Sequence, residues 1–162
     1  MAVLPVACFP DVRLWRLTKA EHAPGLDGEG ARLWGGRWNS PGVAMVYCAS
    51  SLALAALEIL VHLPPAMRRT GALPRLVAVG LDVPDDTILT LDLASLPPNY
   101  GMPDLRAEGD AWIKTRQSLG LRVPSRVIAP EMNVVLNPAH PDMARVIVTG
   151  TDVFVFDDRL AL

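Results

Sequence analysis

Trp34-Gly35-Gly36-Arg37-Trp38-Asn39-Ser40-Pro41-Gly42 opens the stretch of sequence on which the fold depends. A short run of apolar residues on both faces predicts a central strand over Val43–Tyr47, and the apolar run over 50–63 predicts a helix. Glu58 lies inside that run, where a carboxylate is costly to bury unless it is paired or hydrogen-bonded. Arg37 stands between glycines and aromatic rings, so an anion can approach it with little steric obstruction. The stretch therefore indicates a binding site beside a core helix.

The helix has clear ends and one unusual stripe. Either serine at 50–51 is a suitable N-cap, and the prolines at 64–65 end the helix. At 3.6 residues per turn, leucine and isoleucine side chains occupy two stripes that face the core. The third stripe collects small or polar residues, namely Ser51, Ala55, Glu58 and His62. We expect this stripe to line a cavity, and we interpret His62 as a helix histidine with satisfied hydrogen bonds.

The rest of the chain predicts an α+β fold. Alternation and turn residues indicate strands over 11–17, 75–81, 87–91, 133–137, 145–149 and 153–156, with a further short strand near Ser125. A second helix is expected from Asp104 to about Leu119, with Trp112 in the core and Gly120 as its stop. Because helices and strands do not alternate strictly, the pattern favours a mixed or antiparallel sheet in one compact domain over 1–162.

Composition excludes several classes of protein. Of the 162 residues 51% are hydrophobic and 20% are charged, which suits a well-cored soluble domain, and the net charge of −2 argues against a dedicated nucleic-acid-binding surface. The N-terminus has no signal-peptide pattern, and the apolar run over 52–63 is too short to span a bilayer. Cys8 and Cys48 have no paired or metal-type spacing. We therefore expect reduced thiols in a cytoplasmic protein without a direct nucleic-acid or membrane partner.

The sequence lacks several common catalytic motifs. His22, His62 and His140 have no partner at metal-ligand spacing, and the chain has neither a Gly-x-Ser-x-Gly elbow nor a Walker-type loop. One carboxylate with arginines, a tyrosine and a serine fits cleavage of a glycosidic bond in a phosphate-bearing nucleotide. A structural Arg37–Glu58 ion pair would explain the same residues without any activity.

Several motifs, taken together, resemble the RES-domain toxins of bacterial RES–Xre toxin–antitoxin pairs. They are Trp15-Arg16, the Gly35-Gly36-Arg37-Trp38-Asn39 segment with Gly42, the strand ending in Tyr47, the helix from Ala49 through Glu58 to Leu63, Gly109-Asp110-x-Trp112, Val123-Pro124-Ser125, and Asn133 to Pro141. The resemblance extends from about residue 13 to residue 156 and is weakest over 64–105.

The resemblance implies a fold like that of the ADP-ribosyltransferases and an activity on NAD. It implies a toxin that cleaves the nicotinamide–ribose bond of NAD as substrate, by hydrolysis or phosphorolysis, with no prosthetic group and no metal. Protein ADP-ribosylation and a non-catalytic antitoxin-binding module are the alternatives. It also implies an Xre-type antitoxin that covers the active site, and it leaves a homodimer open.

The resemblance also assigns roles to individual residues. It implies that Arg16 and Arg37 bind the NAD phosphates, and that Tyr47 packs on the nicotinamide or its ribose. Glu58 is expected to support the positive charge that develops at the anomeric carbon. Ser125 is expected to hydrogen-bond the ribose or to orient Glu58. On this assignment Arg37, Glu58 and Ser125 are catalytic, and all five residues bind NAD.

Purely structural roles for the same residues stay open. Tyr47 can be a core aromatic and Ser125 can cap a strand end. We interpret Asn133 and Asn137 as turn and strand-end anchors. A second anion site, which would allow phosphate to act as acceptor, could come from the loop arginines Arg68, Arg69, Arg106 and Arg122.

Overall fold

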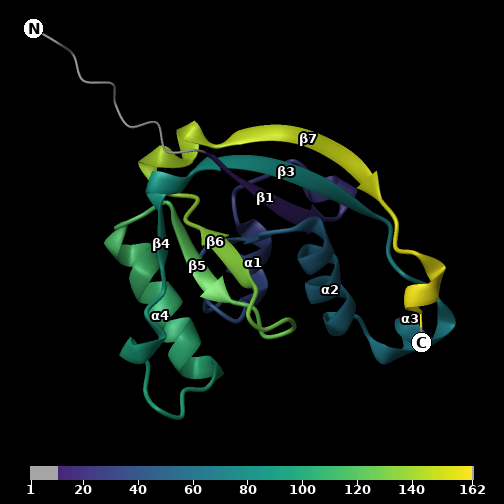
Figure 1. Ribbon diagram of the computed structural model, residues 1–162, viewed down its shortest axis with the longest axis horizontal. Coiled ribbons are helices and arrows are strands. Elements are labelled where there is room, and N and C mark those ends of the chain that lie inside the picture. Colours follow the sequence, from purple (N-terminus) through teal and green to yellow (C-terminus); the bar gives the residue numbers. More distant parts are fainter. Residues whose placement is uncertain (1–10, 162) are drawn as a thin grey trace, which may run out of the picture.

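A single twisted β-sheet forms the centre of the fold (Figure 1). The computed structural model describes residues 11–161. The sheet has seven strands in the order β4-β5-β6-β2-β1-β3-β7, and they are β1 (Asp11–Thr18), β2 (Val46–Ala49), β3 (Leu76–Pro84), β4 (Ile88–Thr90), β5 (Gly120–Pro124), β6 (Met132–Leu136) and β7 (Ile147–Phe154). The α-helices in the described range are α1 (Glu29–Trp34), α2 (Leu52–His62), α3 (Pro65–Thr70) and α4 (Met102–Thr115).

The strand pairing makes the sheet mixed. β4 and β5 are parallel, and every other neighbouring pair is antiparallel. β2 lies in the middle, between β1 and β6, and is largely buried on both faces. The predicted α+β fold with a mixed sheet is therefore confirmed.

The helices on one face of the sheet leave room between them. In Figure 1, α4 lies beside β4 and β5 while α2 lies below β1 and β3, with α1 and the ends of β5 and β6 between them. Two core clusters follow this division: one surrounds Trp38 and Trp112 beside α4, and a smaller one joins Leu54 of α2 to Trp15. A third cluster, around Leu14 and Leu81, packs on the other side of the sheet. The candidate site lies between α2, α1 and the ends of β5 and β6.

Some predicted boundaries are correct and others are wrong. α2 agrees with the prediction, with Ser51 as its N-cap accepting a hydrogen bond from Leu54 N at 3.0 Å. The central strand occupies 46–49, rather than 43–47. The helix expected to reach Leu119 ends at Thr115, because Arg116 adopts a left-handed conformation. The two strands expected over 145–149 and 153–156 form the single strand β7, which has an irregularity where it pairs with Gly80 and Leu81.

Both cysteines were predicted to be reduced thiols. Cys48 is free and fully buried in the sheet, and burial raises the pKa of its thiol to about 12. Cys8 lies outside the described residues. At neutral pH Cys48 therefore stays protonated and acts as a small apolar core residue.

Candidate functional site

A cavity of about 500 Å³ opens between α2, α1 and the ends of β5 and β6. Its lining residues come from segments far apart in the sequence, which the sheet order brings together. The polar and charged lining residues are Arg16, Arg37, Tyr47, Glu58, His62, Arg126 and Asn133. Trp38, Met45, Ile59 and Val123 contribute apolar surface. A mainly apolar cavity with a few converging polar groups is typical of a small-molecule site.

Glu58 is held in place by two donors on other elements. The hydroxyl of Ser125 donates to Oε1 of Glu58 at 2.8 Å, and Nδ2 of Asn133 donates to the same oxygen at 2.6 Å. Within residues 11–161 no hydrogen bond reaches Oε2 of Glu58. The Arg37–Glu58 ion pair that would have explained both residues structurally does not form.

The side chain of Ser125 uses all of its hydrogen-bonding capacity within the protein. Its side-chain oxygen accepts from the backbone N–H of Val127 at 3.1 Å and of Ile128 at 3.0 Å, while its hydroxyl donates to Glu58. A serine hydroxyl has one hydrogen and two lone pairs, so all three are engaged. Ser125 is buried, and it is not among the residues that line the cavity. In this arrangement it orients Glu58, and has no hydrogen left for a ligand.

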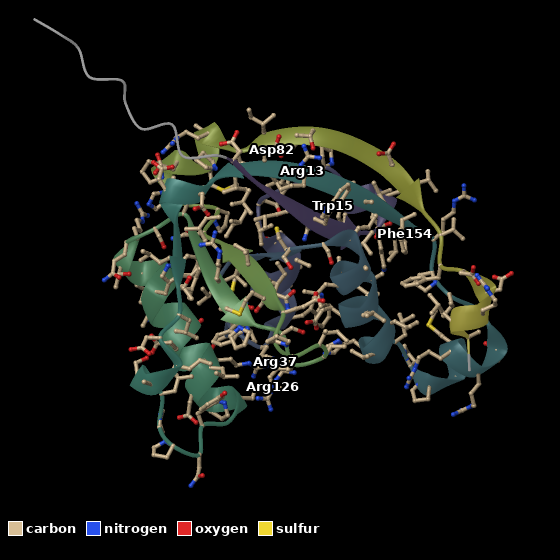
Figure 2. All side chains as sticks on the ribbon, viewed as in Figure 1. Arg13, Trp15, Arg37, Asp82, Arg126 and Phe154 are labelled. Atoms are coloured by element: carbon tan, nitrogen blue, oxygen red, sulfur yellow. The ribbon has the colours of Figure 1, made fainter. Side chains whose placement is uncertain are left out.

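Three arginines line the cavity without a carboxylate partner. Arg16 comes from β1, Arg37 from the loop after α1, and Arg126 from the turn after β5. Within the described chain none of them forms an ion pair, and the buried Nε of Arg16 has no hydrogen-bond partner. Figure 2 shows Arg37 and Arg126 in the same region, below the ends of β5 and β6. Unpaired guanidinium groups around a cavity are suited to bind anions such as phosphates.

Tyr47 braces the loop that carries Arg37. Its hydroxyl accepts from the backbone N–H of Trp38 at 3.0 Å and donates to Oδ1 of Asn39 at 2.7 Å, and burial raises its pKa to about 12. A side chain at Gly36 would collide with the Tyr47 hydroxyl, so the loop needs glycine at that position. Asn39 is fully buried, and its Nδ2 donates to the carbonyls of Ala31 and Val43, each at 2.8 Å. Tyr47 therefore has a structural role at its hydroxyl, while the residue also contributes to the cavity wall.

Helix α4 supports the same loop from the other side. Nε of Arg106 donates to the Gly36 carbonyl at 2.7 Å, and Asp110 Oδ1 accepts from the Ser40 backbone N–H at 3.0 Å. The backbone of Trp38 passes so close to Gly109 that a Cβ there would overlap the Trp38 carbonyl oxygen. The Gly109-Asp110 motif is thus explained by loop support, since Arg37 projects from the loop that α4 holds.

A smaller cavity of about 160 Å³ adjoins the first one. It shares Arg16, Tyr47, Glu58, Ile59 and Asn133 with the main cavity, and adds Trp15 and Ala55 among others. Ala55 was predicted to lie on the cavity-facing stripe of the helix, and it lines this smaller space. His62 Nδ1 lies 2.6 Å from the Glu58 carbonyl oxygen, as expected for a helix histidine with a local hydrogen bond.

The structure thus brings most of the predicted site residues together. Arg16, Arg37, Tyr47 and Glu58 line the main cavity, and Ser125 lies directly behind Glu58.

Sequence reasoning missed two residues. Asn133, predicted to be an anchor, belongs to the interior of β6 and bonds Glu58. Arg126, which had no predicted role, lines the cavity. Asn137 is the buried anchor that was predicted, with Nδ2 donating to the Ile113 carbonyl at 3.1 Å.

The four arginines considered for a second anion site lie elsewhere. Arg106 bonds the Gly36 carbonyl, and Arg122 forms an ion pair with Asp85. Arg68 and Arg69 belong to α3, and neither lines the cavity. A different loop arginine, Arg126, lines the cavity and could bind a second anion there.

Comparison with known proteins identifies relatives over nearly the whole chain. The family model of the RES domain matches residues 13–157. A "Prs ADP-ribosylating toxin" of Sphingobium sp. (strain YBL2) is 36% identical over 157 residues, covering 90% of this chain and 94% of that protein. A "Toxin Res" of Photorhabdus laumondii is 35% identical (91% and 96% covered), and one of Pseudomonas putida is 32% identical (91% and 98% covered).

The fold is also found in a solved structure. A chain in the crystal structure of the M. tuberculosis MbcT–MbcA toxin–antitoxin complex superposes with a TM-score of 0.72 at 21% identity, over 90% of this chain and 85% of that one. Among residues 11–161, no helix is long and apolar enough to cross a membrane. Over the same residues no three His, Cys, Asp or Glu side chains gather as they would around a metal ion.

Proposed function

Since this chain belongs to the RES domain family, we propose that it is the toxin of a type II toxin–antitoxin system and that it degrades NAD. The reaction breaks the bond between the anomeric carbon of the ribose and the nicotinamide nitrogen, and the bonding electron pair leaves with nicotinamide. With water as acceptor a new C–O bond forms and a proton is released, which gives ADP-ribose. With inorganic phosphate, the product is ADP-ribose phosphorylated at the anomeric carbon.

The observation that carries this proposal is the isolated carboxylate at the wall of an arginine-lined cavity. Glu58 is fixed by Ser125 and Asn133, while Arg16, Arg37 and Arg126 remain free to bind an anion. A fixed carboxylate stabilises the positive charge that develops on the ribose as the bond breaks. The two phosphates of NAD are negatively charged and can bind the guanidinium groups of these arginines. The cavity volume of about 500 Å³ lies within the usual range for small-molecule sites.

The proposed roles follow the geometry. Arg16 and Arg37 bind the pyrophosphate, and Arg126 adds a third cationic group that sequence reasoning did not include. Glu58 acts on the anomeric carbon, and Tyr47 packs beside the nicotinamide or its ribose. For Ser125, the engaged hydroxyl favours orientation of Glu58 over a bond to the ribose.

The test is incubation of the purified protein with NAD, followed by chromatography of the products. We expect release of nicotinamide, and loss of activity by at least about 100-fold in Glu58→Gln, as for removal of a group that stabilises transition-state charge. Arg37→Ala should also lose activity, because the pyrophosphate loses a guanidinium partner. Circular dichroism and thermal unfolding check that both variants fold. Unchanged NAD consumption by folded Glu58→Gln would refute the proposal. Parallel digests with and without phosphate show which acceptor the enzyme uses.

Protein ADP-ribosylation is the second candidate function, because one relative is called an ADP-ribosylating toxin. It would appear as transfer of label from NAD carrying a labelled adenylate to a cellular protein. Rapid loss of NAD without labelled protein would exclude it. A non-catalytic antitoxin-binding module, the third candidate, would leave NAD intact in both experiments.

The proposed partner is an Xre-type antitoxin that covers the mouth of the cavity. A structural relative was crystallised as a toxin–antitoxin complex, which supports a partner of this kind. An enzyme that degrades NAD without control would harm its host, so we expect a bound partner to close the cavity. The cognate antitoxin should therefore inhibit NAD consumption at a one-to-one ratio of active sites.

A further inference from the structure

Asn133 holds one oxygen of Glu58 from a rigid part of the fold. It lies on β6, where its backbone pairs with Ala49 of β2 on one side and Val123 of β5 on the other. Its Nδ2 is 2.6 Å from Oε1 of Glu58 and its side chain lines both cavities. A carboxylate can only accept hydrogen bonds when ionised, so the amide nitrogen and not the amide oxygen must face it.

Asn133 and Ser125 engage the same oxygen of Glu58 from neighbouring strands. Ser125 follows β5 and its own oxygen is fixed by the N–H groups of Val127 and Ile128, so neither donor depends on a mobile surface group. With Oε1 receiving two donors and no hydrogen bond reaching Oε2 within residues 11–161, the two carboxylate oxygens are not equivalent.

We infer that Asn133 is a positioning residue that, together with Ser125, locks Oε1 of Glu58 and presents Oε2 to the substrate. This inference rests on the proposed function. A carboxylate held by donors on separate strands costs little reorganisation when positive charge develops beside it. The assignment makes Oε2 the oxygen that faces the anomeric carbon, and it gives the enzyme a fourth polar residue beyond the arginine, glutamate and serine.

The discriminating variant is Asn133→Asp, which keeps the shape of the side chain and replaces the donor with an acceptor. If Asn133 only fills space, Asn133→Leu, which keeps a similar side-chain volume without a donor, should keep the wild-type kcat. If the donor positions Glu58, both variants lose activity and Asn133→Asp loses at least as much, because two carboxylates then face each other. A hydrogen bond to a charged group supports a fall in kcat of about 10- to 100-fold. KM for NAD should change by less than about threefold, since the arginines that bind the phosphates are untouched.

A double-mutant cycle with Ser125→Ala tests whether the two donors act on one oxygen. Independent sites would give additive losses in kcat, whereas residues that share one partner give a combined loss that departs clearly from the product of the single losses. Denaturant unfolding of all three variants measures stability separately. A merely structural role would lower stability and the active fraction without a selective fall in kcat.

The outcomes separate the two proposals. A wild-type protein that leaves NAD intact refutes the proposed function, and this inference with it. An active wild type whose Asn133→Asp variant keeps its kcat refutes the inference alone. A rise in KM at constant kcat also overturns it, because that would place Asn133 in substrate binding.

Discussion

Arg126 places a positive charge at the cavity wall that no carboxylate of the described chain balances. The same holds for Arg16 and Arg37, so the cavity is cationic although the whole chain has a net charge of −2. Such local charge attracts an anionic substrate, and its effect weakens as salt screens it. At the residue scale, binding of the substrate is thus expected to depend on individual guanidinium groups.

The first prediction concerns Arg126. Arg126→Gln should raise KM for NAD by about 5- to 30-fold and leave kcat within about threefold, because a charge-assisted hydrogen bond to phosphate contributes about 1–2 kcal/mol at a partly exposed site. Initial rates over a range of NAD concentrations measure both constants. Arg75→Gln, which removes an exposed arginine outside the cavity lining, is the matched control and should leave KM unchanged. Equal effects of the two variants would contradict the assignment of Arg126 to the site.

The second prediction concerns the Tyr47 hydroxyl. Tyr47→Phe removes the hydrogen bonds to Trp38 and Asn39 and should lower the free energy of unfolding at pH 7 by about 1–3 kcal/mol, since buried partners are left unsatisfied. Chemical denaturation monitored by tryptophan fluorescence measures the change. An unchanged midpoint would show that the hydroxyl does not brace the loop.

The raised pKa of Tyr47 gives a third prediction, at alkaline pH. Burial raises its pKa to about 12 in the fold, against about 10 when unfolded, so the unfolded state loses its proton first. This contribution to stability is complete below pH 10 and is lost as the pH rises to 12. Cys48, whose pKa burial also raises to about 12, contributes with the same sign. Tyr47→Phe should therefore show a shallower loss of stability between pH 10 and 12 than wild type, while keeping the part due to Cys48.

Glu58 could be found from the sequence because a carboxylate in an apolar helix is costly wherever it lies. Asn133 and Arg126 could not, because their roles depend on which strands are neighbours. β6 becomes adjacent to the strand before α2 through pairings between segments more than 80 residues apart, such as Ala49 with Asn133. A polar residue inside an otherwise apolar strand was the available signal at Asn133.

At the scale of elements, α4 supports the loop from Gly35 to Gly42 that positions Arg37. The helix contributes a donor at Arg106, an acceptor at Asp110, and a close approach at Gly109. The loop thus has tertiary partners along most of its length, although it has no regular secondary structure of its own. We therefore expect the position of the loop to depend on its contacts with α4 as well as on Tyr47.

Replacement of Gly109 should disrupt this contact. In Gly109→Ala, the new Cβ would overlap the Trp38 carbonyl oxygen, so the helix and the loop must move apart, and we expect a destabilisation of about 2–4 kcal/mol with reduced NAD turnover. Gly30→Ala, the same exchange inside α1, meets no atom within 4 Å and should stabilise by about 0.5–1 kcal/mol. Thermal and denaturant unfolding compare the two. Similar stability of both variants would mean that α4 does not hold the loop closely.

Elements with clear local signals were predicted well, and the errors lie where tertiary pairing overrides the local pattern. α2 has a serine cap, a continuous apolar pattern and following prolines, all of which lie within the segment itself. β7 was split in the prediction because Gly150 and Asp152 interrupt its apolar pattern, yet pairing with β3 keeps it continuous. α4 ends at Thr115 because Arg116 adopts a left-handed conformation, and the glycine predicted to stop the helix, Gly120, belongs to β5 and pairs in parallel with Ile88 of β4.

At the scale of the whole molecule, the mouth of the cavity carries exposed apolar residues. Trp34 is 81% exposed and Leu33 is 54% exposed, at the end of α1 immediately before the glycines that line the cavity. An exposed tryptophan is uncommon on a monomer and is typical of the centre of an interface. The antitoxin that we propose as partner would cover the cavity most directly by packing on this end of α1.

The last prediction is that Trp34 anchors the antitoxin without taking part in turnover. Trp34→Ser should weaken binding of the cognate antitoxin by about 30-fold or more, as for loss of an interface tryptophan worth about 2 kcal/mol, while free enzyme keeps its NAD consumption. Titration calorimetry measures affinity, and residual activity at a fixed antitoxin concentration provides a second measurement. Val153→Ser, which alters an equally apolar and 62% exposed position on the edge strand β7, is the control. If Val153→Ser weakens the complex and Trp34→Ser does not, the antitoxin docks at the sheet edge, and inhibition must act at a distance from the cavity.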